Sequence, residues 1–172
     1  MSFLKRIIEF FKSDPTRNWP AMPRKSLKFS LADKTLNGMT FGHSFEALEI
    51  FGKPDNEMPI YDKTFHYLRH GLIVELDDQK IDFFAFIIQD DAKEGFAEAQ
   101  TTLVDADGKT IILSKNSAKN DLVAFLGDPQ KIDEDEVEII LFFDINDLKI
   151  EFELDLSQKL KRMNVFPASK IH

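Results

Sequence analysis

The chain has 172 residues, of which 43% are hydrophobic and 30% are charged, and it contains no cysteine. A chain of this length can bury a core without metal ions or disulfides, and this composition excludes an intrinsically disordered protein. The lack of cysteine excludes disulfides, thiol nucleophiles and thiolate metal sites. It also favours a reducing compartment, so we expect a cytoplasmic protein.

The charges are distributed unevenly along the chain. Residues 1–28 contain seven basic and two acidic side chains, a net charge of +5. The remaining residues contain fifteen basic and twenty-eight acidic side chains, a net charge of −13. Such an acidic body repels phosphate groups, which argues against nucleic acid as a partner and favours a basic protein.

Residues 1–12 combine apolar and charged side chains, and the charged ones argue against a secretory signal or a membrane span. We expect this segment to pack against its own domain or a second subunit, with attachment to a membrane surface as the alternative. Residues 13–25 contain three prolines and predict an extended linker, which Trp19 fastens to the domain. The apolar positions of the first segment recur at helical spacing and predict an amphipathic helix: Phe3, Leu4, Ile7, Ile8 and Phe11.

Residues 26–90 and 99–168 show the same succession of patterns, and an acidic connector, residues 91–98, joins them. Each begins with a short strand and continues with a short apolar helix that ends in Gly-x-Pro, at Gly52 and at Gly127. Three strands follow as an antiparallel meander. The sequence therefore predicts an α+β fold of two tandem repeats. Their meanders either stay separate or join into one continuous sheet.

The strands of the two meanders differ in their alternation of apolar and polar residues. In residues 148–155 the alternation is strict, which is typical of a sheet with one face in water. In residues 81–88 and 137–143 both alternating sets are largely apolar. One set can pack on the helix of its own unit, whereas the other needs a cover: the N-terminal helix, the sister unit or a partner. The members of this second set are the candidate binding residues: Phe84, Phe86, Ile88, Ile140 and Phe142.

Three short motifs carry a resemblance to known proteins: Gly-Met-Thr at 38–40, Phe-Gly-Lys-Pro-Asp at 51–55 and Val-Glu-Leu-Asp at 74–77. Their order resembles the modules of the β-lactamase inhibitor proteins, which carry two tandem copies, and of the lipoprotein BamE, which carries one. The resemblance implies a binding sheet and no enzymatic activity. The chain lacks the lipid-accepting cysteine and the disulfide pair of those families. The sequence also resembles an uncharacterised bacterial family of the immunity type.

The sequence offers no convincing active site. His66 and His70 have the spacing of a helical zinc motif, but they fall on a predicted strand that runs into a turn. Asp105 to Gly108 resembles the start of a calcium loop, but its remaining ligands are missing, so a hairpin turn is the better interpretation. The acidic runs fall in connections with nothing to separate their pKa values. We therefore expect no catalytic residues, no metal and no cofactor.

These observations favour a non-catalytic protein-binding module. The most concrete form is an inhibitor or immunity-type protein whose acidic surface meets a basic partner such as a toxin enzyme. The alternative is a structural component that residues 1–12 hold at a membrane surface or in an assembly. An unrecognised hydrolase comes third.

Overall fold

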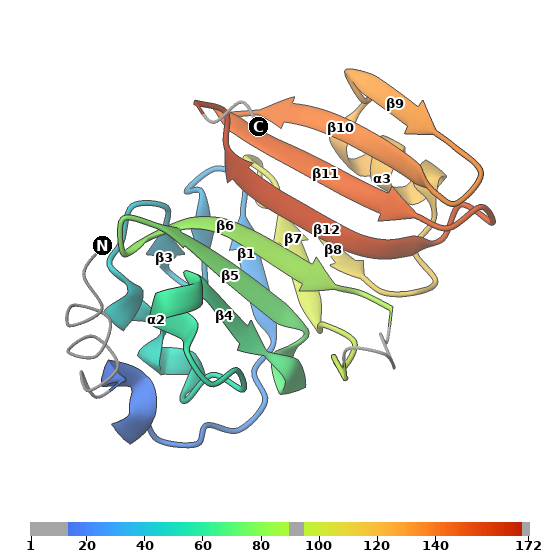
Figure 1. Ribbon diagram of the computed structural model, residues 1–172. Helices are drawn as coiled ribbons and strands as arrows, with labels where there is room; N and C mark the ends of the chain where they lie inside the picture. The colour runs from blue at the N-terminus through green and yellow to red at the C-terminus, as the bar shows by residue number, and fades with distance from the viewer. Residues whose placement is uncertain (1–13, 90–94, 170–172) are drawn as a thin grey trace, which may run out of the picture.

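The computed structural model describes residues 14–89 and 95–169, which form two stacked β-sheets and a few short helices (Figure 1). The larger sheet is antiparallel and has the order β4-β5-β6-β12-β11-β10-β9. Its strands are β4 (Thr64–Tyr67), β5 (Leu72–Asp77), β6 (Lys80–Ile87), β9 (Lys131–Glu134), β10 (Ile139–Ile145), β11 (Leu148–Leu154) and β12 (Leu160–Pro167). The two predicted meanders thus join through β6 and β12.

The smaller sheet has the order β3-β2-β1-β7-β8 and lies behind the larger one in Figure 1. Its central strands β1 and β7 are parallel, and the other neighbours are antiparallel. The strands are β1 (Leu27–Ser30), β2 (Thr35–Leu36), β3 (Met39–Thr40), β7 (Thr101–Val104) and β8 (Thr110–Leu113). The two meanders therefore form one continuous sheet, whereas the opening strands of the two units pair with each other in a sheet of their own.

Five short helices complete the described fold: η1 (Pro15–Asn18), η2 (Phe45–Phe51), α2 (Pro59–Asp62), η3 (Leu68–His70) and α3 (Lys119–Leu126). The predicted helix ends are confirmed. Gly52 and Gly127 follow η2 and α3 with φ angles of 80° and 87°, a region that glycine enters without strain. Figure 1 shows α3 behind β10 and β11.

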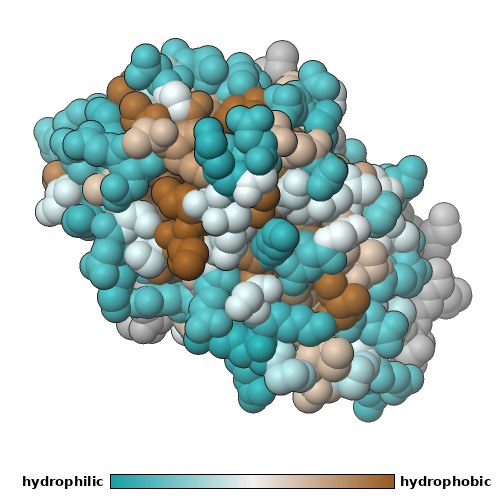
Figure 2. Space-filling view, turned by 180° about the vertical axis from the view of Figure 1, so that it is seen from behind, coloured by the Kyte–Doolittle hydropathy of each residue, from teal (hydrophilic) through white to brown (hydrophobic). Residues whose placement is uncertain are grey.

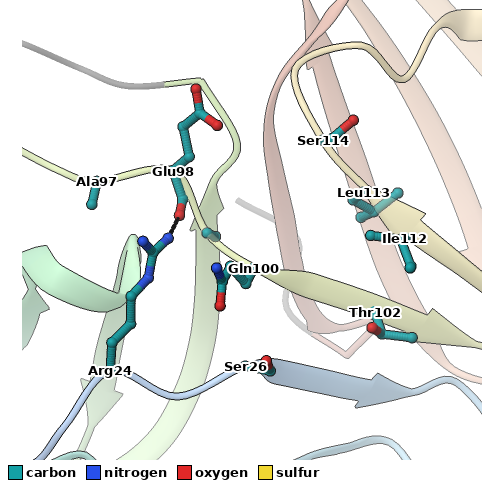
Figure 3. Close-up of a pocket in the computed structure, with 10 residues that line it drawn as sticks. Arg24, Ser26, Ala97, Glu98, Gln100, Thr102, Ile112, Leu113 and Ser114 are labelled. Carbon is teal, nitrogen blue, oxygen red and sulfur yellow. Dashed lines mark hydrogen bonds between the residues drawn. The ribbon is translucent and has the colours of Figure 1, made fainter.

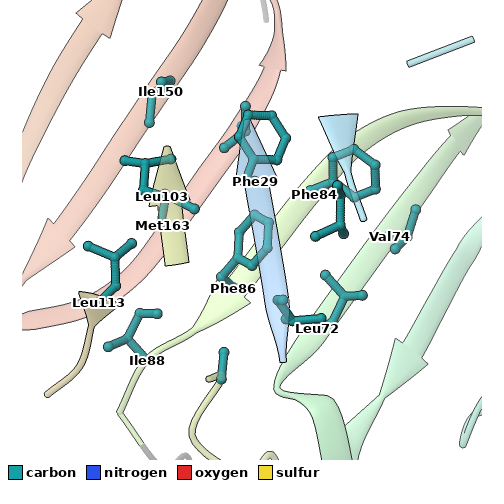
Figure 4. Packing of buried hydrophobic residues seen from close by; sticks show 14 of the residues in the cluster. Phe29, Leu72, Val74, Phe84, Phe86, Ile88, Leu103, Leu113, Ile150 and Met163 are labelled. Atoms are coloured by element: carbon teal, nitrogen blue, oxygen red, sulfur yellow. The ribbon is translucent and has the colours of Figure 1, made fainter. Parts of the chain in front are cut away.

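The core lies between the two sheets (Figure 4). The ring of Phe29 on β1 lies 6.2 Å from that of Phe84 and 6.1 Å from that of Phe86, both in edge-on geometry. Ile88 is buried in the same cluster. The smaller sheet, to which both units contribute strands, therefore covers the face of β6 for which we considered the N-terminal helix, the sister unit or a partner. Phe84, Phe86 and Ile88 have 0% exposure and are core residues rather than surface residues.

A β-bulge changes the alternation that the sequence predicts for β6. Glu75 pairs with Phe83 and Leu76 pairs with Ile81, so Asp82 is the extra residue. Strict alternation places Ile81 on the face opposite Phe84, whereas the bulge lets both side chains face the core. The hairpin of β11 and β12 has a register shift of the same kind, between Glu153 and Leu154.

Corresponding hydrogen bonds precede the two helices. The amide of Ile81 donates to the carbonyl of His43 at 2.8 Å, ahead of η2. The amide of Leu160 donates to the carbonyl of Ser117 at 2.9 Å, ahead of α3. In both halves, a backbone hydrogen bond from the last strand of the meander therefore fixes a residue that precedes the helix.

The predicted linker is an integral part of the fold. Trp19 stacks at 6.3 Å on both Phe45 and Phe65, as expected for a residue that fastens the linker to the domain. The amide of Lys53 donates to the carbonyl of Pro20 at 3.1 Å. The predicted helix over residues 1–12 and the first part of the predicted connector, residues 91–94, lie outside the described residues.

Candidate binding surface

The candidate residues Ile140 and Phe142 lie on the outer face of β10, away from the core. The residues between and beside them, Ile139, Leu141 and Phe143, point inward and are buried. Ile140 and Phe142 are only partly buried. Alternation along one strand therefore places two apolar side chains on a part of the outer face where their cross-strand neighbours are charged.

Phe142 is surrounded by charged residues. Its cross-strand neighbours are Glu151 on β11 and Lys131 on β9. The Lys131 ammonium lies 5.2 Å from the centre of the Phe142 ring, within the range of a cation–π interaction. A small hollow of about 170 Å³ lies beside the ring, with Lys149 and Asp144 in its lining.

Ile140 lies in an open hollow of about 370 Å³ whose other lining residues are all acidic: Asp133, Glu134, Asp135 and Glu138. Two of these carboxylates are paired, Asp133 with Lys131 and Glu138 with Lys161. Glu134 forms no ion pair with any described residue. The hollow therefore combines an apolar wall with a net negative charge.

The carboxylate of Asp135 shapes the rim of this hollow. It accepts hydrogen bonds from the amides of Val137 at 2.7 Å and Glu138 at 2.9 Å, which close the turn between β9 and β10. These two bonds hold the pKa of Asp135 below its ordinary value, so the side chain keeps its negative charge.

This arrangement suits recognition of a cationic side chain. A lysine or arginine can lay its aliphatic stem on Ile140 while its charged head reaches the carboxylates. The strand next to the hollow, β9, ends the larger sheet, and all four of its residues are exposed. Its outer edge is unpaired in the described part of the chain and offers backbone donors and acceptors to a bound segment.

The structure does not bring all five candidate residues to one surface. Ile140 and Phe142 are neighbours on the outer face, whereas Phe84, Phe86 and Ile88 lie on the inner face of the same sheet. The sequence could not distinguish them, because apolar residues on both faces of a strand look alike whether a second sheet or a partner covers them.

Another hollow, of about 610 Å³, lies at the edge of the smaller sheet (Figure 3). Arg24 reaches across and donates to the backbone carbonyl of Glu98, and Lys115 pairs with the Glu98 carboxylate at 2.7 Å. On the strand side lie Thr102 and Ile112, the latter 73% exposed. This side of the molecule is mostly hydrophilic, and its hydrophobic residues form separate small areas (Figure 2). The hollow therefore combines polar and apolar lining residues without a dominant charge.

A buried polar pair lies beneath the linker, at the other end of the larger sheet. His70 has 3% exposure and Tyr67 has 1%. Burial lowers the pKa of His70 below its ordinary value of 6.5, against the opposing effect of a hydrogen bond with the backbone of Pro23. Burial, helped by the nearby Asp55 charge, raises the pKa of Tyr67. Both side chains are therefore neutral at physiological pH.

The two rejected metal motifs have other roles. His66 lies on β4, where its ring contacts that of Phe96 at 5.6 Å, and His70 ends η3. Asp105 accepts hydrogen bonds from the amides of Asp107 and Lys109 in the hairpin turn between β7 and β8. Across residues 14–89 and 95–169, no group of three or more potential ligand residues could hold a metal ion. Within the same residues, no helix is long and apolar enough to cross a membrane.

Comparisons with known proteins give one structural likeness. No family model and no curated protein matches the chain. Among solved structures, the chain is similar to a DUF4309 family protein, YjgB, from Bacillus subtilis subsp. subtilis str. 168. The TM-score is 0.52 at 12% sequence identity, over 77% of this chain and 84% of that chain. At this identity the likeness shows the α+β fold alone.

The buried imidazole makes stability depend on pH. Burial lowers the pKa of folded His70, so the folded protein takes up this proton at a lower pH than the unfolded chain, which takes it up below about pH 6.5. Its contribution to stability is therefore fully present above that pH and is lost as the pH falls. We expect the free energy of unfolding to fall more steeply below about pH 6.5 in the natural protein than in His70→Asn. Denaturant titrations across this range, with His43→Asn as an exposed control, measure the slopes. Equal slopes in all three proteins would contradict this assignment.

Proposed function

We propose that the protein is a non-catalytic protein-binding module that recognises a basic partner through the outer face of β9 and β10. The acidic hollow around Ile140, beside the unpaired edge of β9, is the observation that carries this proposal. An inhibitor or immunity-type role agrees with the resemblance of the sequence to two-module inhibitors. The partner's cationic segment would lie along β9, with one lysine or arginine in the hollow.

The charge of the whole molecule supports the same choice of partner. A net charge of −8 attracts a basic protein over long range, and the carboxylates of the β9–β10 turn continue that charge into the hollow. Complementary charge of this kind raises the association rate and selects against acidic competitors. Asp133, Glu134 and Asp135 are exposed to solvent, which favours binding of a charged partner over acid–base catalysis in a closed site.

We also propose that the two halves are copies of one unit. Ser44 bridges to Lys80 ahead of η2, and Ala118 bridges to Lys159 ahead of α3. The larger sheet supports the same correspondence, since β4, β5 and β6 are followed across its centre by β12, β11 and β10. Only the second copy continues into a further strand, β9, so the proposed binding edge belongs to that copy alone.

A matched pair of lysine substitutions tests the binding surface. Ile140→Lys places a cation inside the acidic hollow and should reduce retention of the partner at least about tenfold. Ile112→Lys adds the same charge on the smaller sheet and should leave retention unchanged. Each protein is immobilised, exposed to extract from its native cell, and the retained proteins are quantified by mass spectrometry. Thermal unfolding of both variants checks that they are folded.

The proposal requires one protein that the natural chain and Ile112→Lys retain and Ile140→Lys does not. Its retention should also weaken as salt is raised, because salt screens exposed charges. Equal retention by all three proteins, or loss only in Ile112→Lys, would exclude the β9–β10 face as the binding surface.

A second candidate function is a component held at a membrane surface by residues 1–12. The smaller sheet already covers Phe84 and Phe86, so the apolar stripe of residues 1–12 is not needed to cover that face. The basic charge of the same segment suits an anionic lipid surface.

Two truncations separate these roles. Removing residues 1–13 should leave the unfolding midpoint unchanged and abolish binding to anionic liposomes. Removing residues 1–23 should lower the midpoint, because it also removes Trp19 from its stack on Phe45 and Phe65. Thermal unfolding and liposome sedimentation measure the two effects. A lowered midpoint in the shorter truncation, with liposome binding retained, would exclude the membrane role.

A further inference from the structure

A hollow of about 330 Å³ lies between the linker and the first half of the larger sheet. It is distant in the fold from Ile140, since it involves β4 and η3 rather than β10. Its lining combines apolar residues, charged residues and two buried polar side chains, among them Phe51, Lys53, Asp55, Tyr67, Arg69 and His70.

His70 is the unusual member of this lining. His70 has only 3% exposure, and its Nε2 atom has no hydrogen-bond partner among the described residues. A hydrogen bond with the backbone of Pro23 also acts on the ring. A buried polar atom without a partner is costly and is rare in folded proteins. A neutral imidazole in this setting has an acceptor available for an N–H group.

If the two halves are copies of one unit, as proposed above, the second half shows which chemical groups the fold needs at this position. Asp55 Oδ2 accepts a hydrogen bond from the amide of Leu68 at 2.7 Å. In the other half, Gln130 Oε1 accepts the corresponding bond from the amide of Asp144, also at 2.7 Å. The fold needs an acceptor at this position but not a negative charge.

Other polar residues that line the hollow also have different counterparts in the second half. In the second half, the positions 76 residues later carry Phe143 in place of Tyr67 and Ile145 in place of Arg69. His70 corresponds to Asn146 by the same spacing. Tyr67 and Arg69 therefore replace apolar counterparts, and both line the same hollow as Asp55, which suits a binding site better than a shared scaffold.

The chemistry of the lining is complementary to a zwitterion. The Asp55 carboxylate and the neutral His70 ring can accept hydrogen bonds from an ammonium group. The side chains of Lys53 and Arg69 can donate to a carboxylate. An apolar wall of Met22 and Phe51 completes the hollow.

We propose that this hollow binds a free α-amino acid with an apolar side chain. Its ammonium group lies between Asp55 and His70, its carboxylate lies against Lys53 and Arg69, and its side chain lies on Phe51. The site belongs to the first half of the chain and is independent of the β9–β10 face.

Titrations with free leucine, methionine and phenylalanine, followed by NMR of the His70 ring and by calorimetry, test this site on the full chain. The probes N-acetyl-leucine and leucine amide each lack one of the two charges. We expect saturable shifts of the His70 resonances with at least one free amino acid and at least about tenfold weaker binding of both blocked forms.

The variant Asp55→Gln copies the side chain of Gln130 and keeps the hydrogen bond to Leu68, so it should fold normally and bind at least about tenfold more weakly. Gln130→Asp, the reciprocal change in the second half, is the control and should leave binding unchanged. The absence of saturable shifts with all three amino acids would overturn the proposal. Equal binding by Asp55→Gln, or by either blocked form, would overturn it as well.

Discussion

The packing of Phe29 against Phe84 and Phe86 is the contact on which the rest of the structure depends. It joins β1 of the smaller sheet to β6 of the larger sheet, and all three rings are fully buried. Burial of aromatic side chains is among the largest favourable contributions that a core of this size can make. Because β6 also pairs with β12, the same strand holds the two halves in one sheet.

This central packing determines which surfaces are free for function. The inner faces of both sheets are occupied by each other, so binding is confined to outer faces, edges and hollows beside them. On the outer face of the second half, charged residues alternate with Ile140 and Phe142. In the first half the outer face is largely apolar around Ile73, Ala85 and Ile87, and Phe96 covers it. The two halves therefore differ in the surface that they present, although their internal hydrogen bonds correspond.

Local patterns in the sequence predicted much of this fold. Gly52 and Gly127 end their helices because glycine at this position is a local requirement. The strict alternation of β11 correctly placed Leu148, Ile150 and Phe152 in the core. The parallel pairing of β1 with β7 was not predictable, because it joins residues 74 apart and no local signal encodes it. The same non-local pairing covers Phe84 and Phe86, which explains why sequence alone assigned them to a binding surface.

The candidate functional residues were harder to predict than the fold. Ile140 and Phe142 were found from their apolar character on a second strand face, but the acidic hollow around Ile140 depends on the turn that Asp135 closes. The hollow around His70 depends on the linker, whose path over Gly52 and His70 is not encoded in any periodic pattern. A histidine near the end of a strand gives no local sign that it will be buried.

The central claim is that both halves share one core and unfold as one unit. Native-state hydrogen exchange measures this directly, because it gives a free energy of opening for each backbone amide. We expect the slowest amides of β5 and of β11 to exchange with the same free energy, equal to that of global unfolding. A markedly lower free energy for either strand would show that its half opens alone, and would contradict the shared core.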